Sequence, residues 1–111
     1  MNVETMTQRM LVIDDDPLFN RILCRALTRR GYAVSGAHTA AEALTLAEQM
    51  RPQMIVLDLN LASSGGSMSG LALVAPLKRA CPDGSIVVLT GYASIATAVE
   101  AIKLGAAHYL A

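Results

Sequence analysis

Four of the nine acidic residues of this chain gather at two places where they can do chemistry together. Asp14, Asp15 and Asp16 follow one apolar run, and Asp58 follows another. Carboxylates brought together in this way suit a hard divalent cation, because Mg²⁺ prefers oxygen ligands and commonly takes one or two carboxylates. Such a metal neutralises the charge that develops in phosphoryl transfer, and one carboxylate can act as the nucleophile and form an aspartyl phosphate.

Aspartates at strand ends also have a plainer explanation, since they cap helices and terminate strands. Asp16 directly precedes Pro17, and the dipole of a helix starting there favours a negative charge. Capping alone does not readily explain a DD pair, a distant single Asp58 and the hydroxyl of Thr90, each at the end of an apolar run. We therefore take the combination as a candidate site.

Alternating strands and helices must position these residues. Three apolar runs do not alternate with polar residues, which indicates strands covered on both faces of a parallel sheet. The predicted strands are residues 10–13, 54–57 and 86–89, with weaker ones at 32–37 and 108–111. The predicted helices are residues 17–30, a segment from the Thr39 N-cap to the Arg51-Pro52 step, 71–81, and 94–104 with Ser94 as N-cap.

Two of these helices carry apolar stripes that we expect to face the sheet. The first stripe contains Leu18, Phe19, Ile22, Leu23, Ala26 and Leu27, and the last contains Ile95, Val99 and Ile102. The order of elements predicts an α/β fold, a doubly wound five-stranded parallel sheet with helices on both faces. In such folds ligands bind beyond the carboxyl ends of the strands, where Asp14, Asp15 and Asp58 lie.

Composition narrows the class of protein further. Apolar residues make up 53% of the 111 residues and charged residues 16%, which excludes disorder and fits one domain. A net charge of zero gives no general attraction to nucleic acid. No stretch approaches the roughly 18–20 apolar residues of a spanning helix, so we expect a cytoplasmic protein without a membrane partner. Residues 1–8 are expected to be a tail and residues 9–111 the domain.

The segments LVIDDDP, IVLDLNL and IVVLTGYASIATAVEAIKLGAAHYLA, with their spacing, resemble the receiver domain of two-component response regulators. The resemblance covers nearly the whole chain and implies a flavodoxin-like, CheY-like fold. Within that family, the segment LTGYASIATAVEAIKLGA is similar to the redox-responsive regulators of the RegA/PrrA/ActR type.

The resemblance implies a role for each matching residue. Asp58 corresponds to the phosphoacceptor, Asp15 to a direct ligand of Mg²⁺, and Asp14 to the acidic neighbour that acts through water. Asn60 corresponds to the residue whose backbone carbonyl binds the metal. The hydroxyl of Thr90 corresponds to the group that bonds a phosphoryl oxygen. Tyr109 corresponds to the aromatic switch residue, which moves inward together with the Thr90 hydroxyl.

The resemblance also implies partners. A sensor histidine kinase would supply the phosphoryl group, phosphorylation can favour a homodimer, and DNA would be reached only through an output domain outside this chain. The expected function is a signalling phosphoacceptor that controls an output, expected to be transcriptional, rather than an enzyme.

Two features depart from the family pattern. The family's lysine after the fifth strand and its fifth helix are absent from the given chain, so we expect the polypeptide to continue past Ala111. Without that helix, apolar sheet surface would stay uncovered. Residues 62–69 lengthen the loop before the third helix, so that either Gly70 or Gly66 is the matching glycine. We expect this Gly/Ser-rich loop to alter access to Asp58.

The sequence is also compatible with two other functions. The segment LVIDDDP also fits a phosphohydrolase similar to haloacid dehalogenases, with Asp14 as nucleophile and Asp16 as acid. The missing lysine alternatively favours an interaction module that works without phosphorylation.

Overall fold

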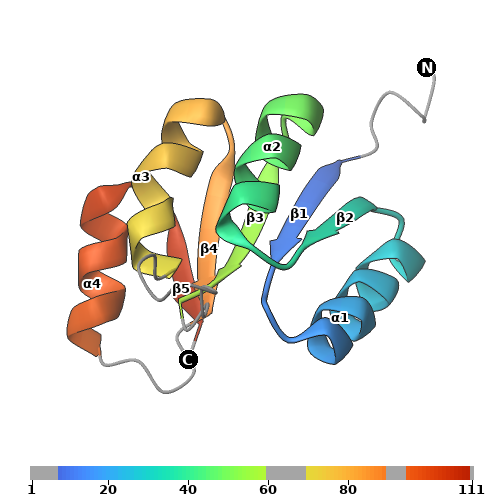
Figure 1. Ribbon diagram of the computed structural model, residues 1–111. Helices are drawn as coiled ribbons and strands as arrows, with labels where there is room; N and C mark the ends of the chain where they lie inside the picture. The colour runs from blue at the N-terminus through green and yellow to red at the C-terminus, as the bar shows by residue number, and fades with distance from the viewer. Residues whose placement is uncertain (1–7, 60–69, 90–94, 111) are drawn as a thin grey trace.

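The protein is a five-stranded parallel sheet with helices on both faces, as the order of elements predicts (Figure 1). The computed structural model describes residues 8–59, 70–89 and 95–110. The strands are β1 (Arg9–Ile13), β2 (Ala33–Ala37), β3 (Met54–Asp58), β4 (Ser85–Leu89) and β5 (His108–Leu110). The helices are α1 (Pro17–Arg29), α2 (Ala40–Met50), α3 (Gly70–Ala80) and α4 (Ile95–Leu104).

The strands lie in the order β2-β1-β3-β4-β5, so β1 and β3 are neighbours in the middle of the sheet. Their register pairs Ile13 with Leu57, the residues immediately before Asp14 and Asp58. The strand order reverses beside β1, and this is the position where doubly wound sheets bind ligands. The two acidic segments are therefore brought to one edge of the sheet by the pairing of its central strands.

The helix ends follow from local sequence signals. Asp16 and Thr39 are the N-caps of α1 and α2, and their side chains accept hydrogen bonds from backbone N–H groups of the first turn. Gly31 ends α1 with a φ of 99°, a left-handed conformation that glycine adopts without strain. The predicted N-cap of α4, Ser94, lies outside the described residues.

Helices α2, α3 and α4 pack in succession on one face of the sheet, whereas α1 lies on the other face against β1 and β2 (Figure 1). The main core lies under the three-helix face. Its large, fully buried side chains include Leu11, Ile13, Ile55, Leu57, Leu73, Leu77 and Ile86. Among the described residues, no helix is long and apolar enough to cross a membrane.

The prediction that all three central strands are covered on both faces is wrong for two of them. In β3 and β4, fully buried residues alternate with half-buried ones, while only β1 is buried after its first residue. The half-buried residues Val56, Val87 and Leu89 line an apolar cavity of about 400 Å³. Its other lining residues include Leu110 and, from α1, Phe19, Leu23 and Leu27. The physical reason is that α1 alone, among the described helices, lies over this face, and it packs mainly against β2 and β1.

The predicted apolar stripes of α1 and α4 are also partly wrong. Leu18 and Ile22 are 56% and 55% exposed, and the one buried residue that α1 contributes is polar, Asn20. In α4, Val99 and Ile102 are exposed and Ala101 is buried instead. In both helices the apolar residues cover more of the circumference than the sheet contacts, so their pattern does not fix which side faces inward.

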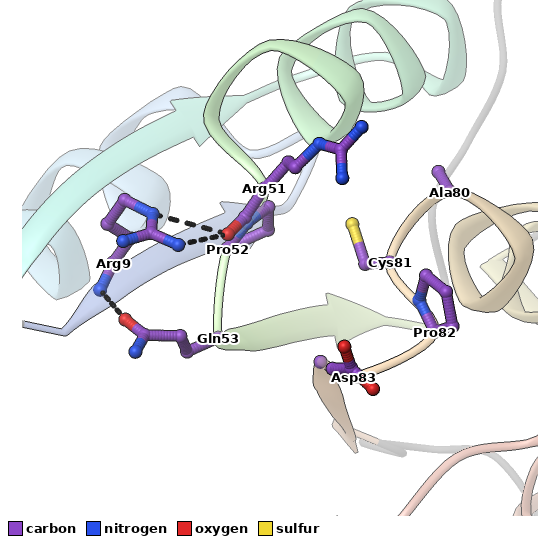
Figure 2. A pocket seen from close by; sticks show the side chains of 9 residues that line it. Arg9, Arg51, Pro52, Gln53, Ala80, Cys81, Pro82 and Asp83 are labelled. Carbon is purple, nitrogen blue, oxygen red and sulfur yellow. Dashed lines mark hydrogen bonds between the residues drawn. The ribbon is translucent and has the colours of Figure 1, made fainter.

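At the amino ends of the strands, Arg9 of β1 connects the sheet to the end of α2. The Arg9 guanidinium donates hydrogen bonds to the carbonyls of Met50 (2.8 Å) and Arg51 (2.9 Å) at the end of α2, as Figure 2 shows for Arg51. The Arg9 amide donates to the side chain of Gln53, and the Gln53 amide donates back to the Arg9 carbonyl. These contacts border a cavity of about 190 Å³ that reaches Cys81. The Arg9 guanidinium thus supplies hydrogen-bond donors to carbonyls that a helix leaves unpaired at its carboxyl end.

Candidate metal and phosphoacceptor site

Three aspartates meet at the carboxyl ends of β1 and β3. Asp14, Asp15 and Asp58 each offer a carboxylate oxygen, and these oxygens all lie within 4.8 Å of one another. Asp14 is buried, and the other two are partly exposed. The structure therefore brings together the three carboxylates predicted from the sequence, from segments more than forty residues apart.

The electrostatics of this cluster favour either a proton or a cation. Burial raises the pKa of the Asp14 carboxyl above its usual value, and the nearby charges of Asp58, Asp15 and Asp16 raise it further. A hydrogen bond from the Asp16 amide to Asp14 Oδ1 (2.9 Å) acts in the opposite direction. Burial outweighs this bond, so ionised Asp14 is destabilised unless positive charge is added.

The chemistry of the donor set fits a hard divalent cation. Three carboxylates at this spacing supply oxygen ligands only, and partial exposure of Asp15 and Asp58 leaves room for water or a phosphoryl oxygen. Zinc sites of the structural kind need cysteine or histidine ligands, and neither residue type joins this cluster. The cluster therefore fits a magnesium-like or calcium-like ion.

Asp16 has the capping role that its position before Pro17 predicts. Its Oδ1 atom accepts hydrogen bonds from the amides of Leu18 (3.0 Å) and Phe19 (3.2 Å), so the carboxylate caps α1. These two hydrogen bonds give Asp16 a structural role at the start of α1.

The backbone around Asp58 is held by a glycine and a strand neighbour. Gly70, buried at the start of α3, lies so close to Asp58 that a Cβ on it would overlap the Asp58 carbonyl oxygen. The Leu59 amide donates to the Leu89 carbonyl (3.0 Å), which extends the β3–β4 pairing past Asp58. Of the two glycines that could match the family's glycine before the third helix, Gly70 has this contact, and Gly66 lies outside the described residues.

The remaining predicted residues are only partly described. Asn60, Thr90 and the loop of residues 62–69 lie outside the described residues. Tyr109 lies in β5, paired in register with Val88, and its side chain is 41% exposed. Its role as a switch stays a prediction.

Sequence reasoning missed Asn20, which lies directly behind the acidic segment. It is 2% exposed, and its side-chain amide donates to the carbonyl of Asp14. The sequence offers little to distinguish Asn20, because α1 also contains Arg21, Arg25, Thr28 and Arg29, and these polar residues are exposed.

The chain has clear relatives. A model of the response regulator receiver domain family matches residues 10–111. The acid tolerance regulatory protein ActR of Sinorhizobium medicae is 44% identical over 102 residues, which cover 92% of this chain and 50% of ActR. The photosynthetic apparatus regulatory protein RegA of Rhodovulum sulfidophilum is 44% identical over 101 residues, 91% of this chain and 53% of RegA.

One solved structure is informative for the site. A response regulator from Burkholderia pseudomallei, crystallised with a phosphorylated aspartic acid, a calcium ion and citrate, superposes with a TM-score of 0.85 and 53% sequence identity. The match covers 93% of this chain and 58% of that one. The chain spans about half the length of the curated relatives named above.

Proposed function

The chain belongs to the response regulator receiver family of two-component systems, and from this premise we propose that Asp58 is its phosphoacceptor and that Asp14 and Asp15 hold Mg²⁺ beside it. The observation that carries the proposal is the meeting of these three carboxylates within 4.8 Å. A phosphorylated aspartate and a calcium ion in the relative from Burkholderia pseudomallei support it.

In the proposed reaction, a carboxylate oxygen of Asp58 attacks the phosphorus of a phosphohistidine on a sensor kinase. The new oxygen–phosphorus bond forms as the nitrogen–phosphorus bond breaks, and the imidazole leaves with the electron pair of that bond. When bound, Mg²⁺ supplies positive charge against the carboxylates and the phosphoryl oxygens. A carboxylate oxygen of Asp58 and the backbone carbonyl of Asn60 would complete the metal ligands of the protein.

The protein's own residues must orient Asp58 and respond to its modification. Gly70 and the β3–β4 pairing restrain the Asp58 backbone, so the nucleophile is presented by rigid elements. We assign to the hydroxyl of Thr90 the hydrogen bond to the new phosphoryl group. Tyr109 would then move inward, which makes the β4–β5 region the element whose equilibrium phosphorylation shifts.

We propose that the protein acts in the cytoplasm as a signalling phosphoacceptor rather than as a turnover enzyme. Its partners would be a cognate sensor histidine kinase and, after phosphorylation, a second copy of itself. A further relative, 36% identical, is the alginate biosynthesis transcriptional regulatory protein AlgB of Pseudomonas putida, and its name supports a transcriptional output. DNA would then be reached through an output domain.

The test is the intact mass of the protein after incubation with Mg²⁺ and a small acyl phosphate. We expect one phosphoryl group per chain, absent in Asp58→Asn and absent when the metal is chelated. Asp83→Asn is the matched control, because Asp83 is an exposed aspartate at the opposite edge of the sheet.

Two results would overturn the proposal. One is an adduct that Asp58→Asn retains, and the other is the absence of any adduct on the wild-type protein. Steady turnover of a phosphate ester that depends on Asp14 would support the phosphohydrolase reading instead.

A further inference from the structure

Asn20 is a buried polar residue whose side chain is fully used. Its amide nitrogen donates to the carbonyls of Asp14 (3.0 Å) and Ala37 (2.9 Å), and its Oδ1 atom accepts a hydrogen bond from the thiol of Cys24 (3.3 Å). A buried amide of this kind costs free energy unless its donors and acceptor are all paired. The pairing with two strands and its own helix fixes the side chain in one orientation.

The opposing strand is shaped to admit this side chain. Gly36 of β2 faces Asn20, and a Cβ on Gly36 would overlap Asn20 Oδ1 and stand 3.2 Å from Cys24 Sγ. A glycine in a strand interior often marks such a close approach. Asn20, Cys24 and Gly36 therefore form one fitted contact between α1 and β2.

The two carbonyls that Asn20 binds lie at the carboxyl ends of β1 and β2. Ala37 is the last residue of β2, and Asp14 is the first residue after β1. The Asp14 amide also donates to the Ala37 carbonyl (3.1 Å). Asp14 is therefore tied to β2 directly through its amide and, through the side chain of Asn20, by its carbonyl. Strand pairing ends here, and Asn20 supplies a donor to carbonyls beyond it.

These contacts determine the direction of the acidic segment. The carbonyl that Asn20 binds belongs to the peptide group joining Asp14 to Asp15. Fixing this peptide group sets where the side chains on either side of it point. The same segment is held on its other side by the hydrogen bond from the Asp16 amide to Asp14 and by the Asp16 cap of α1.

We propose that Asn20 is a positioning residue for the divalent-cation site: it aligns Asp14 and Asp15 by binding the peptide group between them. The inference rests on the proposed function, because it assigns Asn20 to the metal site of that function. Residues behind metal ligands hold their orientation in many proteins, and replacing them typically lowers metal affinity about 10- to 100-fold.

The experiment is a titration of the folded protein with Mg²⁺ alone, followed by backbone amide chemical shifts near Asp15. We expect Asn20→Ala to bind Mg²⁺ at least about 10-fold more weakly than wild type. The matched control is Leu77→Ala, which also truncates a fully buried side chain but in α3, away from the site. It should lose stability and keep the wild-type Mg²⁺ affinity.

A second variant tests the same contact from the strand side. Gly36→Ala keeps Asn20 but displaces its amide, so Mg²⁺ affinity should fall as in Asn20→Ala. In the double variant the alanine at position 36 meets no amide and keeps only its close approach to Cys24 Sγ. Its separate effect on Mg²⁺ affinity should therefore vanish, and its effect on stability should become smaller. Such non-additivity is the mark of a direct contact.

The outcomes separate the two proposals. If wild type fails to bind Mg²⁺, the proposed function is wrong. If wild type binds and both folded single variants bind equally well, the inference about Asn20 is wrong. If Asn20→Ala does not fold, Gly36→Ala decides the question, because it retains every hydrogen-bonding group of the contact.

Discussion

Gly70 lies directly against the backbone of Asp58, with no room for a Cβ between them. Gly70 is the first residue of α3 and Asp58 the last residue of β3. The two residues are twelve positions apart in the sequence. The start of α3 therefore packs directly against the end of the strand that carries the proposed nucleophile.

This contact predicts that Gly70→Ala destabilises the protein. Alanine normally stabilises a helix relative to glycine by about 1 kcal/mol, so helix propensity alone gives the opposite sign. The overlap with the Asp58 backbone should dominate, because a backbone cannot swing aside as a flexible side chain can. We expect a loss of about 1–3 kcal/mol in the free energy of unfolding. Urea denaturation measures it, and a stabilised variant would contradict the contact.

The raised pKa of Asp14 predicts a pH dependence of stability in the absence of divalent metal. Between the ordinary carboxyl pKa of 3.8 and the higher pKa in the folded state, the folded protein binds more protons than the unfolded chain. Stability should therefore fall as pH rises through this window, and the full penalty should persist above it.

Asp14→Asn removes the ionisable group that causes this penalty. At neutral pH and with a chelator present, the variant should have a higher Tm than wild type. Its Tm should also fall less as pH rises above about 4. Thermal melts followed by circular dichroism test this, and parallel profiles for the two proteins would assign the pH dependence to other groups.

Mg²⁺ should stabilise the folded protein in proportion to its affinity. A ligand at 100 times its Kd adds about 2.7 kcal/mol to the free energy of unfolding, because it binds the assembled carboxylates and not the unfolded chain. Asp15→Asn should lose most of this gain, whereas the exposed control Asp83→Asn should retain it. An equal gain in Asp15→Asn would place the metal elsewhere.

The contacts of Arg9 predict a stabilising role at the edge away from the site. Arg9→Ala should lower the free energy of unfolding by about 1 kcal/mol, because two carbonyls at the end of α2 lose their donor. Arg9→Lys should not restore stability, since an ammonium group lacks the planar fork that reaches both carbonyls.

A matched control for Arg9 is Arg25→Ala, at an exposed position of α1. Surface substitutions of this kind stay within about 0.5 kcal/mol of wild type. Chemical denaturation measures all three variants, and full recovery in Arg9→Lys would show that charge alone, rather than the paired hydrogen bonds, provides the stabilisation.

The sequence by itself determined the order of the elements and the residues that gather at the site. The apolar runs before Asp14 and Asp58 are local signals, and parallel strands place their carboxyl ends at one edge of a sheet. The helix cap at Thr39 and the end of α1 at Gly31 could also be predicted from local sequence, because each depends only on neighbouring residues.

Only the tertiary structure decided which side of each helix faces inward. The apolar stripe of α1 spans about half of the helix, and Asn20 lies at its border. The pattern therefore did not show that Leu18 and Ile22 are exposed or that Asn20 is buried. The choice was made by the carbonyls at the ends of β1 and β2 and by the space above Gly36. Those partners are distant in the sequence, and a hydrogen bond between distant segments leaves no periodic trace in either of them.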